Sequence, residues 1–223
     1  DETADLTGKI NAVVTVTDGD GDTATDSVDI GDQIFFSDDG PTADITSGQG
    51  SVTVDESSGL QDNDTGNAAV AALFSSLTGV STDMTQFAQS SASLVDASAS
   101  SAGADQEGAT TVLSLAVNGG DGTDSGLETT DGTQIFLYQE NGLIVGRIGN
   151  EVGDGTDTAN ADGTIAFAIA INQDGTVSVA QYASITNPDA GDGTAGSYDE
   201  TADLTGKINA VVTVTDGDGD TAT

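Results

Sequence analysis

The sequence contains no cysteine, no histidine and no tryptophan, and only three basic residues stand against 38 acidic ones. Without cysteine the chain cannot be stabilised by disulfides, and thiols give no indication of its redox compartment. The lack of both histidine and cysteine removes the commonest catalytic bases, nucleophiles and transition-metal ligands. We therefore expect a protein that is not an enzyme and has no small-molecule substrate.

The positive side chains are Lys9, Arg147 and Lys207, and the formal net charge is −35. Phosphate groups are bound by clusters of Lys and Arg, so we expect neither a nucleic-acid partner nor direct contact with an anionic membrane. No apolar run approaches the roughly 20 residues of a membrane span. Self-repulsion of this size predicts either bound divalent cations or an adaptation to high salt, and the two are compatible.

One block of the sequence is present twice. Asp1–Thr25 recurs letter for letter as Asp199–Thr223. A perfect copy at this spacing predicts that the sequence is part of a tandem array. It covers about one repeat and a short stretch of the neighbouring repeat. The expected partners are therefore neighbouring identical repeats of the same chain.

A domain boundary is predicted at Ser37–Pro41, where Pro41 fixes its own φ and favours an extended Gly40. We expect residues 1–40 to be the end of one repeat, and residues 41–223 to be the next repeat without its closing strands. As a hypothesis, residues 24–36 complete such a sandwich from outside, within the chain or between neighbours.

Alternating apolar and polar residues predict strands along most of the chain. Residues 10–17 and 24–30 predict a hairpin with an acidic tip. Asn-Gly and Asp-Gly pairs between later runs are strong hairpin signals. The fold class is therefore all-β, an antiparallel β-sandwich of Greek-key type. The remaining expected strands are 32–36, 52–54, 110–117, 133–138, 143–148, 164–171 and 176–182.

The Ala- and Ser-rich segment from residue 67 to residue 104 differs from the rest of the chain. It predicts a short helix over residues 68–77 and a weakly ordered connection over residues 90–104. A segment of this length predicts either an inserted or a split domain, so residues 41–223 are expected to form one domain or two.

Carboxylates that alternate with glycines can direct several hard oxygen atoms at one cation. The alternative is a plain solvated turn, because turns favour Asp and Gly. Asp18–Asp22 is not an EF-hand loop, since Thr23 replaces the required glycine and the flanks alternate like strands. Candidate ligands for several Ca²⁺ ions are Asp18, Asp20, Asp22, Asp216, Asp218 and Asp220 in the repeated loop, Asp38 and Asp39 at the boundary, Asp55, Glu56, Asp62 and Asp64 after an expected strand, and Asp121, Asp124, Asp154 and Asp157 in GDGTD loops.

Three runs carry a resemblance to a known family. They are VTVTDGDGDTATDSVDIGDQIFFSDDGPTA (14–43), TQIFLYQENGLIVGRI (133–148) and GTIAFAIAINQDGTVSVAQYASI (163–185). They resemble the repeats of giant RTX adhesins exported by type I secretion in Gram-negative bacteria, the Lap-type biofilm adhesins in particular.

The resemblance implies an Ig-like β-sandwich extender domain that binds Ca²⁺ at and near domain junctions. It also implies a secreted, outer-membrane-anchored protein of the cell surface that stiffens and projects a ligand-binding region in adhesion and biofilm formation. The DGDGD loops and the pair Asp38 and Asp39 match the family best, and Asp55 and Glu56 match it less well. The alternative function is a binding module that recognises a glycan or a partner protein through its loops.

Overall fold

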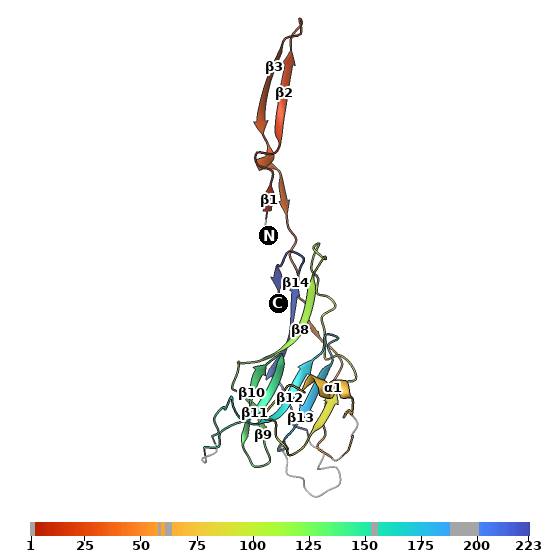
Figure 1. Cartoon of the computed structure of the whole chain (residues 1–223), viewed down its shortest axis with the longest axis vertical. Coiled ribbons are helices and arrows are strands. Elements are labelled where there is room, and N and C mark those ends of the chain that lie inside the picture. The colour runs from red at the N-terminus through yellow and green to blue at the C-terminus, as the bar shows by residue number, and fades with distance from the viewer. Residues whose placement is uncertain (1–2, 58, 61–63, 153–155, 188–200) are drawn as a thin grey trace.

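The computed structural model describes residues 3–57, 59–60, 64–152, 156–187 and 201–223 (Figure 1). These residues form antiparallel sheets with one short α-helix, so the fold is all-β. The described residues between 41 and 223 make up a sandwich of two main sheets, called the body below. Residues 3–37 form an extension that projects from one end of the body along the long axis of the molecule (Figure 1).

The larger sheet of the body has the strand order β6 (Gln86–Gln89), β13 (Val177–Gln181), β12 (Ile165–Ile171), β11 (Leu143–Ile148), β10 (Gln134–Glu140) and β9 (Thr123–Glu128). The smaller sheet consists of β15 (Thr221–Ala222), β14 (Ile208–Thr215) and β8 (Thr110–Val117). Strands β9 to β13 follow one another as a meander. Between β10 and β11, Asn141 and Gly142 both have positive φ, as a two-residue hairpin turn requires.

Both faces of the larger sheet are buried. On one face Leu137, Ile144 and Phe167 pack against Leu115 of β8. This is why β12 is a continuous apolar run rather than an alternating one.

The opposite face is covered by helix α1 (Ala68–Leu73) and the residues after it. Val70 and Phe74 pack there in a cluster with Tyr138 and Val145. The Asn67 side chain accepts a hydrogen bond from the Ala69 N–H and caps the helix. The helix is shorter than the expected 68–77, and no helix in the described part of the chain has the length and apolar character needed to cross a membrane.

A third cluster closes the end of the body nearest the extension. Val212 and Val214 of β14 pack there with Leu113 of β8, and Ile45 and Val95 pack against them. Two expectations are corrected here. Residues 90–104 are not a weakly ordered connection, because β7 (Val95–Asp96) pairs with β5 (Thr46–Ser47), and residues 52–54 form no strand.

The extension contains β1 (Thr3–Asp5), β2 (Asn11–Thr17), β3 (Thr23–Asp29), the 3₁₀ turn η1 (Gly31–Gln33) and β4 (Phe35–Ser37). Strand β2 pairs with β3, and β1 pairs with β4. Among the described residues, none of these strands pairs with the body. Residues 24–36 therefore do not complete the body of their own chain, and the expected strand 32–36 is replaced by a turn followed by β4.

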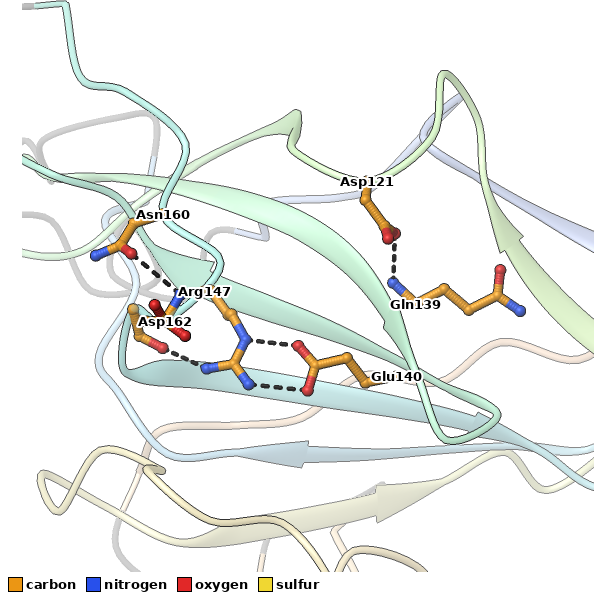
Figure 2. A network of polar contacts seen from close by, with 7 residues as sticks. Asp121, Gln139, Glu140, Arg147, Asn160 and Asp162 are labelled. Carbon is orange, nitrogen blue, oxygen red and sulfur yellow. Dashed lines mark hydrogen bonds and ion pairs between the residues drawn. The ribbon is translucent and has the colours of Figure 1, made fainter.

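Arg147, the only arginine, ties the hairpin of β10 and β11 to the loop before β12 (Figure 2). Its Nε and Nη2 atoms donate to the two carboxylate oxygens of Glu140 over 2.6 and 2.8 Å. Its Nη1 atom donates to the carbonyl oxygen of Gly163 over 2.5 Å. The hydrogen bond with Glu140 raises the pKa of the guanidinium group. The pair leaves only 12% of the Arg147 side chain exposed, so this cation is fully engaged.

We predict that Glu140→Gln lowers the free energy of unfolding by about 1–3 kcal/mol, because a mostly buried guanidinium loses its charged hydrogen-bond acceptor. Urea denaturation measures the change. Glu151→Gln is the matched control, since Glu151 is exposed and the same charge is removed. Equal changes in the two variants would show that the ion pair does not stabilise the body.

Candidate metal centre

The repeated DGDGD sequence folds into the same turn in both of its copies. In the second copy, the Asp216 N–H donates to the carbonyl oxygen of Asp220 over 3.1 Å. Oδ1 of Asp216 accepts from the N–H groups of Gly219 and Asp220 over 3.1 and 2.8 Å. The corresponding bonds of Asp18 are 3.0, 3.1 and 2.9 Å long. The sequence therefore fixes this loop by itself, whatever surrounds it.

The second copy of the loop meets the linker between the extension and the body. One carboxylate oxygen from each of Asp38, Asp216, Asp218 and Asp220 lies within 4.8 Å of the others. With Ca²⁺–oxygen bonds of about 2.3–2.6 Å, two ligand atoms on opposite sides of the ion are about 4.6–5.2 Å apart. These four residues, called the junction cluster below, could therefore hold a metal ion.

Two oxygen atoms of the junction cluster are buried without a partner. Oδ2 of Asp38 and Oδ2 of Asp216 have no hydrogen-bond donor, and Asp216 is only 3% exposed. A buried carboxylate oxygen without a partner costs free energy unless a donor or a cation compensates for it. The cationic groups of Arg147 and Lys207 lie elsewhere, bonded to Glu140 and to the carbonyl oxygen of Asp124.

The second copy of the loop is exposed to the negative charge of the linker in addition to its own. The pKa of Asp218 is raised, first by its hydrogen bond with the Asp216 side chain and then by desolvation and the negative charges of Asp216 and Asp38. In the first copy the pKa of Asp18, which corresponds to Asp216, is lowered, mainly by its hydrogen bond with the Asp20 side chain, so the same two positions of the loop are hydrogen-bonded in both copies. The linker thus crowds negative charge onto the second copy, and a divalent cation is the kind of ligand that relieves this crowding.

The first copy of the loop lies at the free tip of the hairpin formed by β2 and β3. Oxygen atoms of Asp18, Asp20 and Asp22 also lie within 4.8 Å of one another. All three residues are exposed, and this group contains no fourth carboxylate. The tip therefore has the same loop as the junction cluster without the ligand that the linker supplies there.

Asp39 lies next to the junction cluster, and its side chain fastens the linker to the body. Its Oδ2 atom accepts a hydrogen bond from the Ala104 N–H over 3.1 Å. Thr42 then exchanges two backbone hydrogen bonds with Ser101, 2.7 and 2.9 Å long. The Asp44 N–H donates to Oγ of Ser100. This series of bonds holds the linker against residues 100–104 and so holds Asp38 in front of the loop.

Among the described residues, the other predicted ligands are not brought together into a group of three or more. Each of these carboxylates instead accepts at least one backbone hydrogen bond and fastens a loop, as Asp121 does with Gln139 in Figure 2. The pairs are Asp55 with Ser57, Glu56 with Ile185, Asp64 with Asp55, Asp121 with Gln139, Asp124 with Gly126 and Asp157 with Gln134. Asp62 and Asp154 lie outside the described residues.

The sequence prediction missed what surrounds the second loop. The Gly217 N–H donates to the carbonyl oxygen of Asp105 over 2.9 Å, and the carbonyl oxygen of Glu107 lies 2.6 Å from where a Cβ on Gly217 would be. These contacts seat the loop against residues 105–107. No local signal marks them, because backbone carbonyl groups are the partners.

We predict that Gly217→Ala lowers the thermal midpoint and weakens cation binding, because the added methyl group clashes with backbone and costs about 1–3 kcal/mol. Gly19→Ala is the matched control, since Gly19 occupies the same position in the first copy and nothing lies within 4 Å of its Cβ position. Differential scanning calorimetry with and without Ca²⁺ measures both. An equal effect of the two substitutions would contradict the seating described here.

The family comparison covers the body of the protein. Residues 51–223 match the family described as Domain of unknown function (DUF5801). No curated protein and no solved structure matches the chain. The matched region includes three of the four carboxylates of the junction cluster, and Asp38 precedes it. Because the match extends over more than half of the sequence, the chain belongs to the DUF5801 family.

Proposed function

We propose that this protein is a structural extender repeat of a bacterial surface adhesin, stiffened by Ca²⁺ at the joint between successive repeats. The observation that carries the proposal is the junction cluster, in which a linker carboxylate and three loop carboxylates converge with two buried oxygen atoms left unpartnered. The work of such a protein is mechanical: it separates what lies at its two ends.

Calcium is the cation that the chemistry of the junction cluster favours. All four donors are carboxylates, and the sequence has no histidine or cysteine to add nitrogen or sulfur ligands. Hard oxygen donors in a loop of adaptable geometry suit Ca²⁺, whereas Mg²⁺ demands near-ideal octahedral geometry and keeps several waters. Affinities of about 10⁻⁴ to 10⁻³ M, typical of extracellular modules, would fill the site in millimolar Ca²⁺.

The cation would act on the angle between the extension and the body. Asp38 belongs to the linker that leaves β4, and Asp216, Asp218 and Asp220 belong to the turn between β14 and β15. Without a cation these carboxylates repel one another, which pushes the linker away from the body. With one bound, the same carboxylates attract a common centre and hold the linker in place.

Repetition extends this arrangement along an array. Asp18, Asp20 and Asp22 are the first copy of the loop, so a preceding repeat would offer them the counterpart of Asp38. Each joint would then bind its own ion. Several weak sites along one chain would together convert a string of repeats into a rod that holds a ligand-binding region away from the cell surface.

The alternative of a glycan-binding module gains no support from the tyrosines. Sugar recognition commonly uses exposed aromatic rings, and Tyr138 and Tyr182 are buried in the core cluster under α1. Tyr198 lies outside the described residues. The mechanical role therefore remains the better supported of the two.

We predict that 10 mM Ca²⁺ raises the free energy of unfolding over that in EDTA by about 1.4–2.7 kcal/mol per filled site, from the expected range of affinities. Calorimetry measures this change, and small-angle X-ray scattering measures the accompanying change in shape. Chelation is expected to shorten the mean end-to-end distance and to broaden its distribution, because the linker is released.

Asp38→Asn is expected to reduce the Ca²⁺-dependent changes in stability and shape, because it removes the ligand that belongs to the linker. Asp83→Asn removes the same charge from an exposed loop away from the junction cluster and should keep both changes in full. Identical melting and scattering in Ca²⁺ and EDTA would refute the proposal. NaCl at matched ionic strength separates specific binding from simple screening.

A further inference from the structure

One segment of the body contacts both halves of the junction cluster. Residues 100–107, called the bracket below, lie between β7 and β8. The first part of the bracket, residues 100–104, bonds to the linker that carries Asp38. The last part, residues 105–107, contacts the acidic turn between β14 and β15. The bracket therefore connects the two halves through protein contacts alone.

The bonds between the bracket and the linker do not include any ligand atom of the junction cluster. Besides the bonds of Asp39 and Thr42, the bracket makes two with Asp44. The Asp44 N–H donates to Oγ of Ser100 over 3.0 Å, and the same hydroxyl donates to the carbonyl oxygen of Asp44 over 2.9 Å. Removal of a cation from the junction cluster leaves all of these bonds in place.

Apolar contacts hold the same stretch of the linker. Ala43 and Ile45 pack against the buried cluster of the body that contains Ala102, which is 7% exposed. Strand β5 follows directly and pairs with β7. Burial and backbone pairing thus add to the hydrogen bonds in holding residues 39–47 on the body.

The bracket also seats the acidic turn. Gly217 lies between two of the ligands in the sequence, and its N–H donates to the carbonyl oxygen of Asp105 over 2.9 Å. The carbonyl oxygen of Glu107 lies so close that a side chain does not fit at this position. The bracket thus holds two ligands through the residue between them, as it holds Asp38 through Asp39.

The stretch before Asp38 has no comparable anchor. Strand β4 pairs with β1, and no hydrogen bond joins residues 31–37 to the described part of the body. Ser37 is exposed. Repulsion among the carboxylates therefore acts on the chain at the point where its bonds to the body begin.

We infer that the bracket holds the two halves of the junction cluster together without the cation, so that the joint turns only before Asp39. The inference rests on the proposed cation site and adds what assembles that site. Loss of the ion frees the extension, while residues 39–47 stay on the body and keep Asp38 beside the turn. Binding then requires little ordering of the protein, because the ligands are already in place.

A disulfide between the linker and the bracket tests where the joint turns. Thr42 and Ser101 form an antiparallel pair that exchanges two backbone hydrogen bonds, so their Cα atoms are about 5.5 Å apart, a separation that a disulfide spans. Both residues are exposed, and the sequence has no cysteine of its own. Full-length Thr42→Cys with Ser101→Cys is studied in its oxidised and reduced forms, by small-angle X-ray scattering in Ca²⁺ and in EDTA and by calorimetric titration with Ca²⁺.

The oxidised and reduced forms are expected to show the same change in shape on chelation, because the joint turns before the disulfide. Their Kd values for Ca²⁺ should agree within about twofold, since the bracket already holds the linker closed. Loss of the shape change on oxidation, or a Ca²⁺ affinity that rises several-fold on oxidation, would overturn the inference alone. If the wild type does not respond to chelation either, the proposed cation-dependent joint is refuted and the inference falls with it.

Gly103→Ala tests the bracket as a positioning element. Gly103 has a φ of +70°, and a Cβ there would lie 2.8 Å from Oδ2 of Asp39. Gly108→Ala is the matched control, since Gly108 has a φ of +85° and nothing lies within 4 Å of its Cβ position. Both variants strain the backbone, but only the first displaces the linker.

The Kd for Ca²⁺ should rise about tenfold in Gly103→Ala, as expected if the linker is in place for about a tenth of the time, and should stay unchanged in Gly108→Ala. The disulfide between Thr42→Cys and Ser101→Cys should restore the affinity of Gly103→Ala, because it returns the linker to the bracket. A general loss of stability would not be rescued in this way. Equal affinities of the two glycine variants, or no rescue by the disulfide, would overturn the inference.

Discussion

The structure of this very acidic chain depends on keeping its carboxylates apart or on compensating their negative charge. Several predicted ligands are compensated by backbone hydrogen bonds, which come from their own loop for Asp55 and Asp124 and from a distant segment for Asp121 and Asp157. The junction cluster is the exception, because tertiary contacts of the linker press Asp38 towards the turn between β14 and β15. The body, the linker and the loop thus converge on one place where negative charge exceeds what the protein's own cations compensate.

The duplicated block separates local from tertiary causes of structure. Its hairpin and its acidic turn form in both copies, with nearly equal hydrogen bonds around Asp18 and Asp216. Burial, by contrast, depends on the rest of the body, since β8 pairs with β14 and not with β2, and Ile45 and Val95 pack against the cluster that contains Val212 and Val214. Period-two alternation therefore predicts which face of a strand is available for burial, and the rest of the chain decides whether that face is buried.

Much of the sandwich could be predicted from the sequence, because strand 110–117 alternates along its second half, strand 143–148 starts with a short apolar run, and Asn-Gly marks the turn before it. Strand β9 was missed, since its buried positions include Ser125, whose hydroxyl donates to the carbonyl oxygen of Ile135. The strand expected at 52–54 was wrong, because Val52 packs on the core without a pairing partner. The loop of the candidate site was predicted, but its convergence with Asp38 depends on contacts between residues far apart in sequence.

The direction of β8 and β14 has a consequence for a chain under tension. Both strands run roughly along the long axis of the molecule, antiparallel and joined over eight residue pairs (Figure 1). A pull along that axis loads their hydrogen bonds in shear, so many bonds must break at once, whereas a pull across it would unzip them one by one. The longest pairing of the smaller sheet is thus oriented to resist a pull along the long axis.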